Sequence, residues 1–134
     1  MLFRSIDIRH PDDKVLSKMD EAVRSGVQRI AEQGGLRFNL EQIFYYAPVP
    51  FDQTCVSAVD HAAQAHGYTS RRIVAGAGHD ACFVAHAAPT SMVFIPCIDG
   101  ISHNEVEDIE PEWSTAGANV MLHAMLEKAE RSGS

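Results

Sequence analysis

The chain has 134 residues, of which 46% are hydrophobic and 22% are charged, a composition typical of globular proteins. Its formal net charge of −7 argues against a nucleic-acid or anionic-membrane partner, and no apolar run approaches the length of a membrane span. No signal-peptide pattern opens the chain, and its three cysteines lack CxxC spacing, so we expect a cytoplasmic protein. Its seven histidines point to metal or acid–base chemistry.

The first part of the chain predicts a strand–helix–strand unit. Apolar and polar residues alternate over residues 2–9, which is typical of a strand with one polar face. A proline and two acids at 11–13 open a helix that the glycine pair at 34–35 ends, and a second strand is expected at about 37–46. One helix over two strands cannot close a core alone, so this unit needs a covering partner.

Two prolines, Pro48 and Pro50, favour a stiff extended connection, and we place a domain boundary there between residues 1–47 and 48–134. The second part predicts helix–strand–helix–strand–helix, which gives an α/β (mixed α+β) fold class. Sheets of this kind place ligands beyond the carboxyl ends of their strands. The elements expected in this part are helices at 53–66, 79–87 and 110–131 and strands at 72–75 and 91–96.

His79 and His103 each follow one of these two strands through a glycine-containing loop, so both rings would face one crevice if the strands are parallel neighbours. At a helix start, His79 could polarise a carbonyl, and Gly78 would let a ligand approach the backbone. A glycine-lined turn with a capping histidine remains the alternative. His103 is a suitable zinc donor, but no second ligand stands at a convincing spacing, so a surface-loop histidine also remains open.

Arg9 lies at the end of the first predicted strand, on a polar face that also carries Ser5 and Asp7. Its guanidinium could bind a carboxylate through two hydrogen bonds. The alternative is an arginine paired with Asp7 or Asp12 in solvent. The sequence pattern leaves both interpretations open.

Three segments, IDIRHPDD, AGAGHDA and MVFIPCIDGISHNEVED, together with the closing helix, resemble the C-terminal part of the N-carbamoyl-L-amino-acid hydrolases. That family groups with allantoate amidohydrolase and β-ureidopropionase among the zinc aminoacylases and carboxypeptidases. The resemblance implies an α/β catalytic domain with two metal ions and an inserted α+β lid that also forms the dimer. Residues 1–47 would be the C-terminal part of the lid, and 48–134 the C-terminal part of the catalytic domain.

The resemblance also implies roles for individual residues. Arg9 would hold the substrate carboxylate, and the backbone at Gly78 would contact the substrate. His79 would polarise the scissile carbonyl or stabilise the oxyanion, and His103 would be the last metal ligand. The metal would be zinc, manganese, cobalt or nickel, and the substrate an N-carbamoyl-L-amino acid or ureido acid cleaved at a non-peptide C–N bond.

The chain departs from this family in one large respect. The other metal ligands and the general base of the family lie upstream of the residues seen here, and a single histidine cannot hold a catalytic dinuclear site. We therefore expect a fragment or truncated product that is inactive alone, with a companion N-terminal chain or a homo-oligomer covering its exposed faces. The alternatives are a non-catalytic self-associating remnant and a metal-independent binder of carboxylate ligands.

Overall fold

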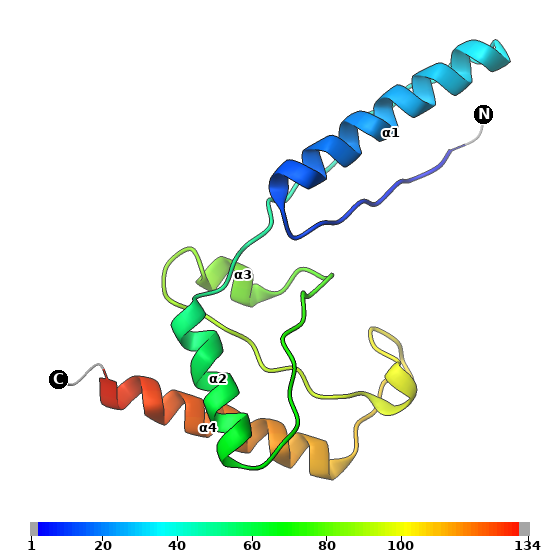
Figure 1. Ribbon diagram of the computed structural model, residues 1–134. Coiled ribbons are helices and arrows are strands. Elements are labelled where there is room, and N and C mark those ends of the chain that lie inside the picture. The colour runs from blue at the N-terminus through cyan, green and yellow to red at the C-terminus, as the bar shows by residue number, and fades with distance from the viewer. Residues whose placement is uncertain (1–2, 132–134) are drawn as a thin grey trace. The chain divides into compact units, whose positions relative to one another are not determined.

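The computed structural model describes residues 3–131 and divides the chain into two units, Met1–Pro50 and Phe51–Ser134 (Figure 1). The division follows Pro50, within the proline segment where a boundary between residues 47 and 48 was expected. The assignment of these two parts to a lid and a catalytic domain stays a prediction.

Helices account for all the regular structure in the described residues. Three of the predicted helices are confirmed with nearly the expected bounds, whereas the helix predicted at 79–87 forms only over five residues. The helical elements are α1 (Asp13–Gly34), α2 (Gln53–Ala65), α3 (Asp80–Val84), the 3-10 turn η1 (Ile98–Gly100) and α4 (Pro111–Arg131).

The four predicted strands, at 2–9, 37–46, 72–75 and 91–96, are wrong for the part of the chain that the structure describes, since residues 3–131 contain no strand. The mixed α/β class therefore fits the chain only in part. Alternating side chains favour an extended backbone, but a strand also requires a neighbouring chain that pairs with its N–H and C=O groups. None of these segments pairs in this way within the described residues.

The first unit consists of α1 and the segments that flank it. Asp12 caps the helix by accepting hydrogen bonds from the backbone N–H groups of Lys14 (2.8 Å) and Val15 (3.3 Å). Gly35 ends it in the left-handed conformation with φ 61°, where a glycine costs least. Tyr45 donates a hydrogen bond to Asp13, which ties the segment after the helix to its first turn.

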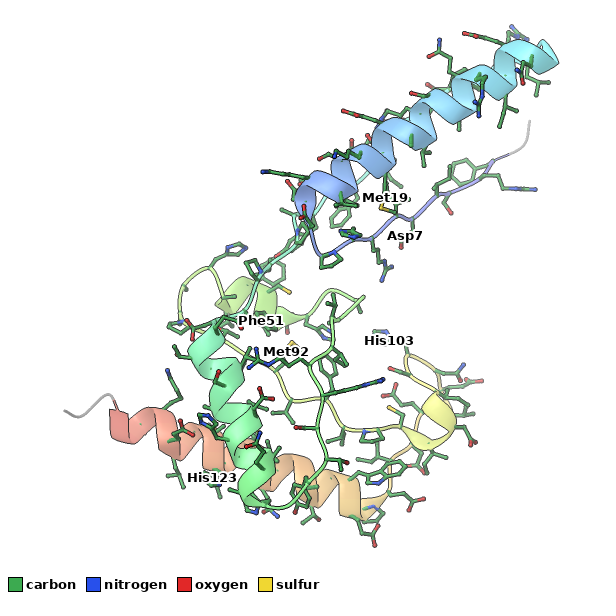
Figure 2. All side chains as sticks on the ribbon, in the orientation of Figure 1. Asp7, Met19, Phe51, Met92, His103 and His123 are labelled. Carbon is green, nitrogen blue, oxygen red and sulfur yellow. The ribbon has the colours of Figure 1, made fainter. Side chains whose placement is uncertain are left out.

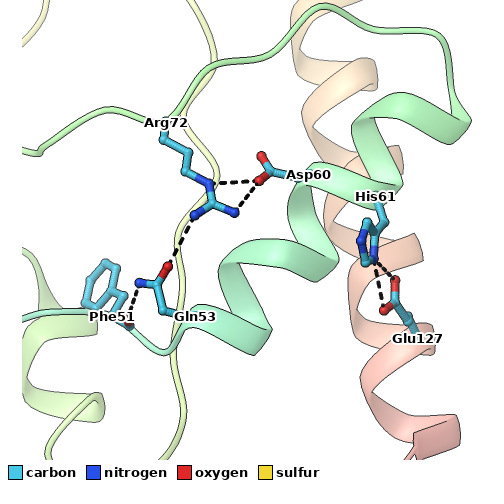
Figure 3. Close-up of polar contacts among 6 residues, drawn as sticks. All are labelled: Phe51, Gln53, Asp60, His61, Arg72 and Glu127. Carbon is cyan, nitrogen blue, oxygen red and sulfur yellow. Dashed lines mark hydrogen bonds and ion pairs between the residues drawn. The ribbon is translucent and has the colours of Figure 1, made fainter.

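The second unit is built on the packing of α2 against α4, which Figure 1 shows crossing in green and orange-red. Small side chains fill the contact, so the two helix backbones approach closely. Two polar contacts also join the helices. Lys128 Nζ donates to Thr54 Oγ1 at 2.6 Å. His61 Nδ1 lies 3.3 Å from Glu127 Oε1, a contact that Figure 3 shows. The buried core residues are Ala58, Ala62, Ala63, Val120 and Ala124, with Val59 and Val93 packed against them.

Many large apolar side chains stay exposed in both units, and the buried residues are mainly alanines. On α4, one run of four such residues lies away from the buried Val120 and Ala124. Its members, exposed by 53–63%, are Met121, Leu122, Met125 and Leu126. Over residues 3–131, no helix is both long and apolar enough to cross a membrane.

Candidate functional site

Arg9 lies in the first unit, where its guanidinium is engaged by a neighbouring carboxylate. Its Nε lies 3.1 Å from both oxygens of Asp7, and one of its terminal nitrogens forms an ion pair with the same group. The side chains remain 61% and 65% exposed, so solvent screens the pair. The hydrogen bond from Arg9 lowers the pKa of Asp7 below its usual value. The alternative pairing expected from the sequence is therefore the one that the structure contains.

Gly78 and His79 form the turn that leads into α3. His79 occupies the N-cap position, but its side chain makes no capping hydrogen bond. Its ring instead packs edge-on against Phe94, with the ring centroids 5.5 Å apart and the planes at 67°. Space is open where a side chain on Gly78 would begin, so a ligand could approach the backbone there. The alternative of a capping histidine is not seen, and the role of His79 toward substrate stays a prediction.

His103 lies on the loop that follows η1, and Figure 2 shows this loop with the histidine near its tip. Its backbone adopts the left-handed conformation with φ 57°, which is uncommon for a residue with a side chain. The backbone N–H of His103 donates to Glu107 Oε2 at 2.7 Å. Its side chain is exposed.

Phe94 connects the surroundings of the two histidines. It contacts the His79 ring, and it belongs to the segment 91–96 that runs directly into Cys97 and the His103 loop. The turn of Gly78 and His79 therefore lies beside the segment that carries the loop of His103. Arg9 belongs to the other unit, so its place relative to these residues stays a prediction.

The described residues do not make a metal centre by themselves. Across residues 3–131, no three or more His, Cys, Asp or Glu side chains converge as a metal ion requires. His103 has the right donor chemistry for a divalent metal, but the rest of a donor set would have to come from outside these residues.

A sequence model of peptidase family M20/M25/M40 matches residues 5–127 of this chain. The chain belongs to this family. The matched span contains Arg9, Gly78, His79 and His103. Family membership is compatible with a divalent metal in an intact M20/M25/M40 enzyme.

Several amidohydrolases resemble this M20/M25/M40 chain. It is 44% identical over 126 residues to an N-carbamoyl-L-amino-acid amidohydrolase of Rhizobium meliloti, covering 94% of this chain and 30% of the relative. It is 33% identical to an allantoate amidohydrolase of Bacillus subtilis, covering 77% of this chain and 25% of the relative. A crystal structure of a hydantoinase/carbamoylase family amidase from Burkholderia multivorans superposes with TM-score 0.88 at 67% identity, over 90% of this chain and 29% of that one.

The chain thus spans about 30% of the length of the curated relatives it matches. The four candidate residues occupy a matched segment, so the family assignment includes them without assigning their roles. An activity, a substrate and a partner can therefore only be proposed for this chain.

Sequence reasoning missed the contacts that two residues, Arg72 and Glu107, make within this part of the M20/M25/M40 chain. Arg72 is fixed to α2 by Asp60, through Nε at 2.9 Å, and by Gln53, through Nη1 at 3.2 Å (Figure 3). These partners are 12 and 19 residues away, so no local spacing signals them. Glu107 contacts both His103 and Cys97. Its spacing of four residues after His103 was the one available signal, and that spacing is nonspecific.

Proposed function

We propose that this chain supplies part of the active site of an amidohydrolase that cleaves a non-peptide C–N bond of N-carbamoyl-L-amino acids or ureido acids. The observation that carries the proposal is the family match over residues 5–127, which includes Arg9, Gly78, His79 and His103. The 44% identity to an N-carbamoyl-L-amino-acid amidohydrolase supports the substrate class.

Arg9 binds the carboxylate of the substrate in this proposal. A guanidinium presents a planar pair of N–H donors that matches a carboxylate, so it fixes orientation as well as adding affinity. The contact of Arg9 with Asp7 shows that this guanidinium can engage a carboxylate through more than one nitrogen, which is the chemistry that the role requires. The substrate must displace Asp7 to reach the guanidinium.

His79 donates a hydrogen bond to the carbonyl oxygen of the carbamoyl or ureido group. A donor placed where negative charge develops stabilises the transition state more than the ground state, which raises kcat. The edge-on packing on Phe94 holds the ring without using it as a helix cap, which leaves its polar atoms for this task. Open space at Gly78 lets the substrate lie against the backbone.

His103 is one ligand of a divalent metal, such as zinc, manganese, cobalt or nickel, in an intact enzyme. When bound, such a metal would polarise the carbonyl and activate water. The described residues lack a group of three donors, so the 134-residue chain alone is expected to be inactive. The remaining ligands and the general base would come from a longer polypeptide or a companion chain.

The test is a chimera with the amidase of Burkholderia multivorans, which is 67% identical over the aligned segment. The aligned segment of that amidase is replaced by this chain, and ammonia release from N-carbamoyl-L-amino acids and from allantoate is measured. We expect hydrolysis by the chimera and none by the isolated chain. Replacement of His79 by Ala should lower kcat by about 10²–10³-fold.

His86→Ala is the matched control, since His86 is exposed just after the same short helix. It should leave kcat unchanged. A chimera in which His79→Ala and His86→Ala have the same small effect would contradict the proposal for His79. Loss of all hydrolysis in the unsubstituted chimera, with a normal thermal transition, would contradict the wider proposal.

We also propose that the isolated chain self-associates, which keeps the non-catalytic module as a second candidate. The observation that favours it is the exposed apolar run Met121, Leu122, Met125 and Leu126 on α4. Light scattering coupled to gel filtration should give a dimer or larger for the chain. Met125→Glu should return it to a monomer, whereas Glu112→Gln, on the same helix, should not. A monomeric unsubstituted chain at about 100 μM would contradict this, because association through a specific interface is expected well below that concentration.

A further inference from the structure

The loop that carries His103 is closed by hydrogen bonds at its base. The backbone N–H of Ile98 donates to the carbonyl oxygen of Asp108 at 2.8 Å. Between these residues, Asp99 and His103 both have positive φ angles, 55° and 57°. A residue with a side chain adopts this conformation at a conformational cost, so it persists only where surrounding contacts hold it.

The two oxygens of the Glu107 carboxylate contact two different places on this loop, one near its tip and one at its base. Oε2 accepts a hydrogen bond of 2.7 Å from the backbone N–H of His103. Oε1 accepts one of 3.7 Å from the thiol of Cys97. The backbone N–H of Glu107 also donates to the carbonyl oxygen of Asn104 at 3.0 Å. The carboxylate therefore links the tip of the loop to Cys97, the residue just before its base.

We propose that Glu107 is a positioning residue for His103. Its carboxylate holds the backbone of His103 in the left-handed conformation and thereby sets where the imidazole leaves the loop. This inference rests on the proposed role of His103 as a metal ligand. Groups that orient a metal ligand from outside the coordination sphere typically change metal affinity by about 10–100-fold when removed.

The contacts of Glu107 distinguish it from the other acid of the loop. Glu105 is exposed on the same loop and takes part in none of the hydrogen bonds that close it. It carries the same charge at a similar distance along the chain from His103. Substitution of Glu105 therefore removes the same charge from the loop without removing the link to His103.

The first experiment uses the 134-residue chain and needs no metal and no activity. Amide hydrogen exchange at His103 is followed by NMR in the unsubstituted chain and in Glu107→Ala, Glu107→Gln and Glu105→Ala. We expect Glu107→Ala to speed exchange at His103 at least tenfold, and Glu107→Gln to retain most of the protection because its amide oxygen still accepts the bond. Glu105→Ala should have no effect.

The amides of Ala62 and Val120, in the α2–α4 core, report whether each variant remains folded. Faster exchange at His103 with an unchanged core supports the inference. Equal exchange at His103 in Glu107→Ala and in the unsubstituted chain would overturn it. If Glu107→Ala loses the core, the milder Glu107→Asp, whose shorter side chain withdraws the acceptor, gives the deciding comparison.

The second experiment measures zinc affinity in the chimera with the Burkholderia multivorans amidase. We expect Glu107→Ala to weaken zinc binding about 10–100-fold, with recovery in Glu107→Gln and no change in Glu105→Ala. Unchanged zinc affinity in Glu107→Ala would overturn the positioning role. Unchanged zinc affinity in His103→Ala would instead reject His103 as a metal ligand. That result would contradict the proposed function, and because it comes from a different variant it is distinct from a failure of the positioning role.

Discussion

Gly117 on α4 and Ile95 lie so close that no side chain fits between them: a Cβ atom on Gly117 would be 2.5 Å from Cγ2 of Ile95. Ile95 belongs to the segment 91–96, next to Phe94, which contacts His79. The same segment leads into the loop of His103. Because Gly117 has no side chain, the segment 91–96 can pack directly against the backbone of α4.

Gly117→Ala should destabilise the second unit. Overpacking costs about 1–3 kcal/mol, whereas a glycine-to-alanine change inside a helix contributes only about 0.5–1 kcal/mol of stabilisation. We expect a net loss of about 1 kcal/mol. Urea unfolding followed by fluorescence of Trp113, which lies on α4, measures it.

Gly26→Ala is the matched control, because Gly26 lies inside α1 and a Cβ atom added there would have no neighbour within 4 Å. It should stabilise its helix by about 0.5–1 kcal/mol, as seen by circular dichroism. If Gly117→Ala raises the unfolding midpoint in the same way, the close approach of Ile95 does not exist in solution.

Asp52 makes α2 sensitive to acid. Its carboxylate accepts hydrogen bonds from Thr54 and Cys55, which lower its pKa from 3.8 to about 2. A lowered folded-state pKa stabilises the fold above the unfolded value, and this contribution is lost as pH falls from about 4 through about 2. Asp52→Asn keeps a capping oxygen but does not titrate.

The measurement compares urea midpoints at pH 5 and pH 2.5 for the two proteins. We expect the unsubstituted chain to lose more stability over this interval than Asp52→Asn, while the two differ little at pH 5. Equal losses would mean that the cap is not formed in the folded state at pH 5.

Helix ends could be predicted from the sequence because their determinants are local. Asp12 and Asp52 each cap the helix that follows by accepting hydrogen bonds from the backbone N–H groups two and three residues ahead. Gly35 ends α1 by its own left-handed conformation. The strands could not be predicted in this way, because pairing depends on segments far away in the chain rather than on local residues. The contact of Arg9 with Asp7, two residues away, was among the expected alternatives, whereas the partners of Arg72 were not.

Asp7 should compete with substrate for Arg9. In the chimera, Asp7→Asn is expected to lower KM for an N-carbamoyl-L-amino acid by about two- to fivefold, the range that an exposed ion pair supports. Arg9→Gln should raise KM instead, with kcat affected less in both cases. Ser5→Ala, on the same exposed segment, is the control and should leave KM unchanged. An unchanged KM in both Asp7→Asn and Arg9→Gln would remove Arg9 from the carboxylate site.

Cys97 should react slowly with alkylating agents, and Glu107 should be part of the reason. Burial, the negative charge of Glu107 and the hydrogen bond to it all raise the pKa of the Cys97 thiol. Because the thiolate is the reactive form, Glu107→Gln should speed alkylation of Cys97 by iodoacetamide at pH 8 by at least about twofold.

Cys55 provides the control within the same molecule. Burial and Asp52 raise the pKa of its thiol, and Lys128 acts in the opposite direction, so Glu107 has no part in it. Peptide mass spectrometry separates the two alkylation rates. A faster Cys97 with an unchanged Cys55 places the Glu107 carboxylate beside Cys97 in solution. Equal acceleration of both thiols would instead mean that the substitution loosens the whole second unit. The experiment would then give no support for a contact between Glu107 and Cys97.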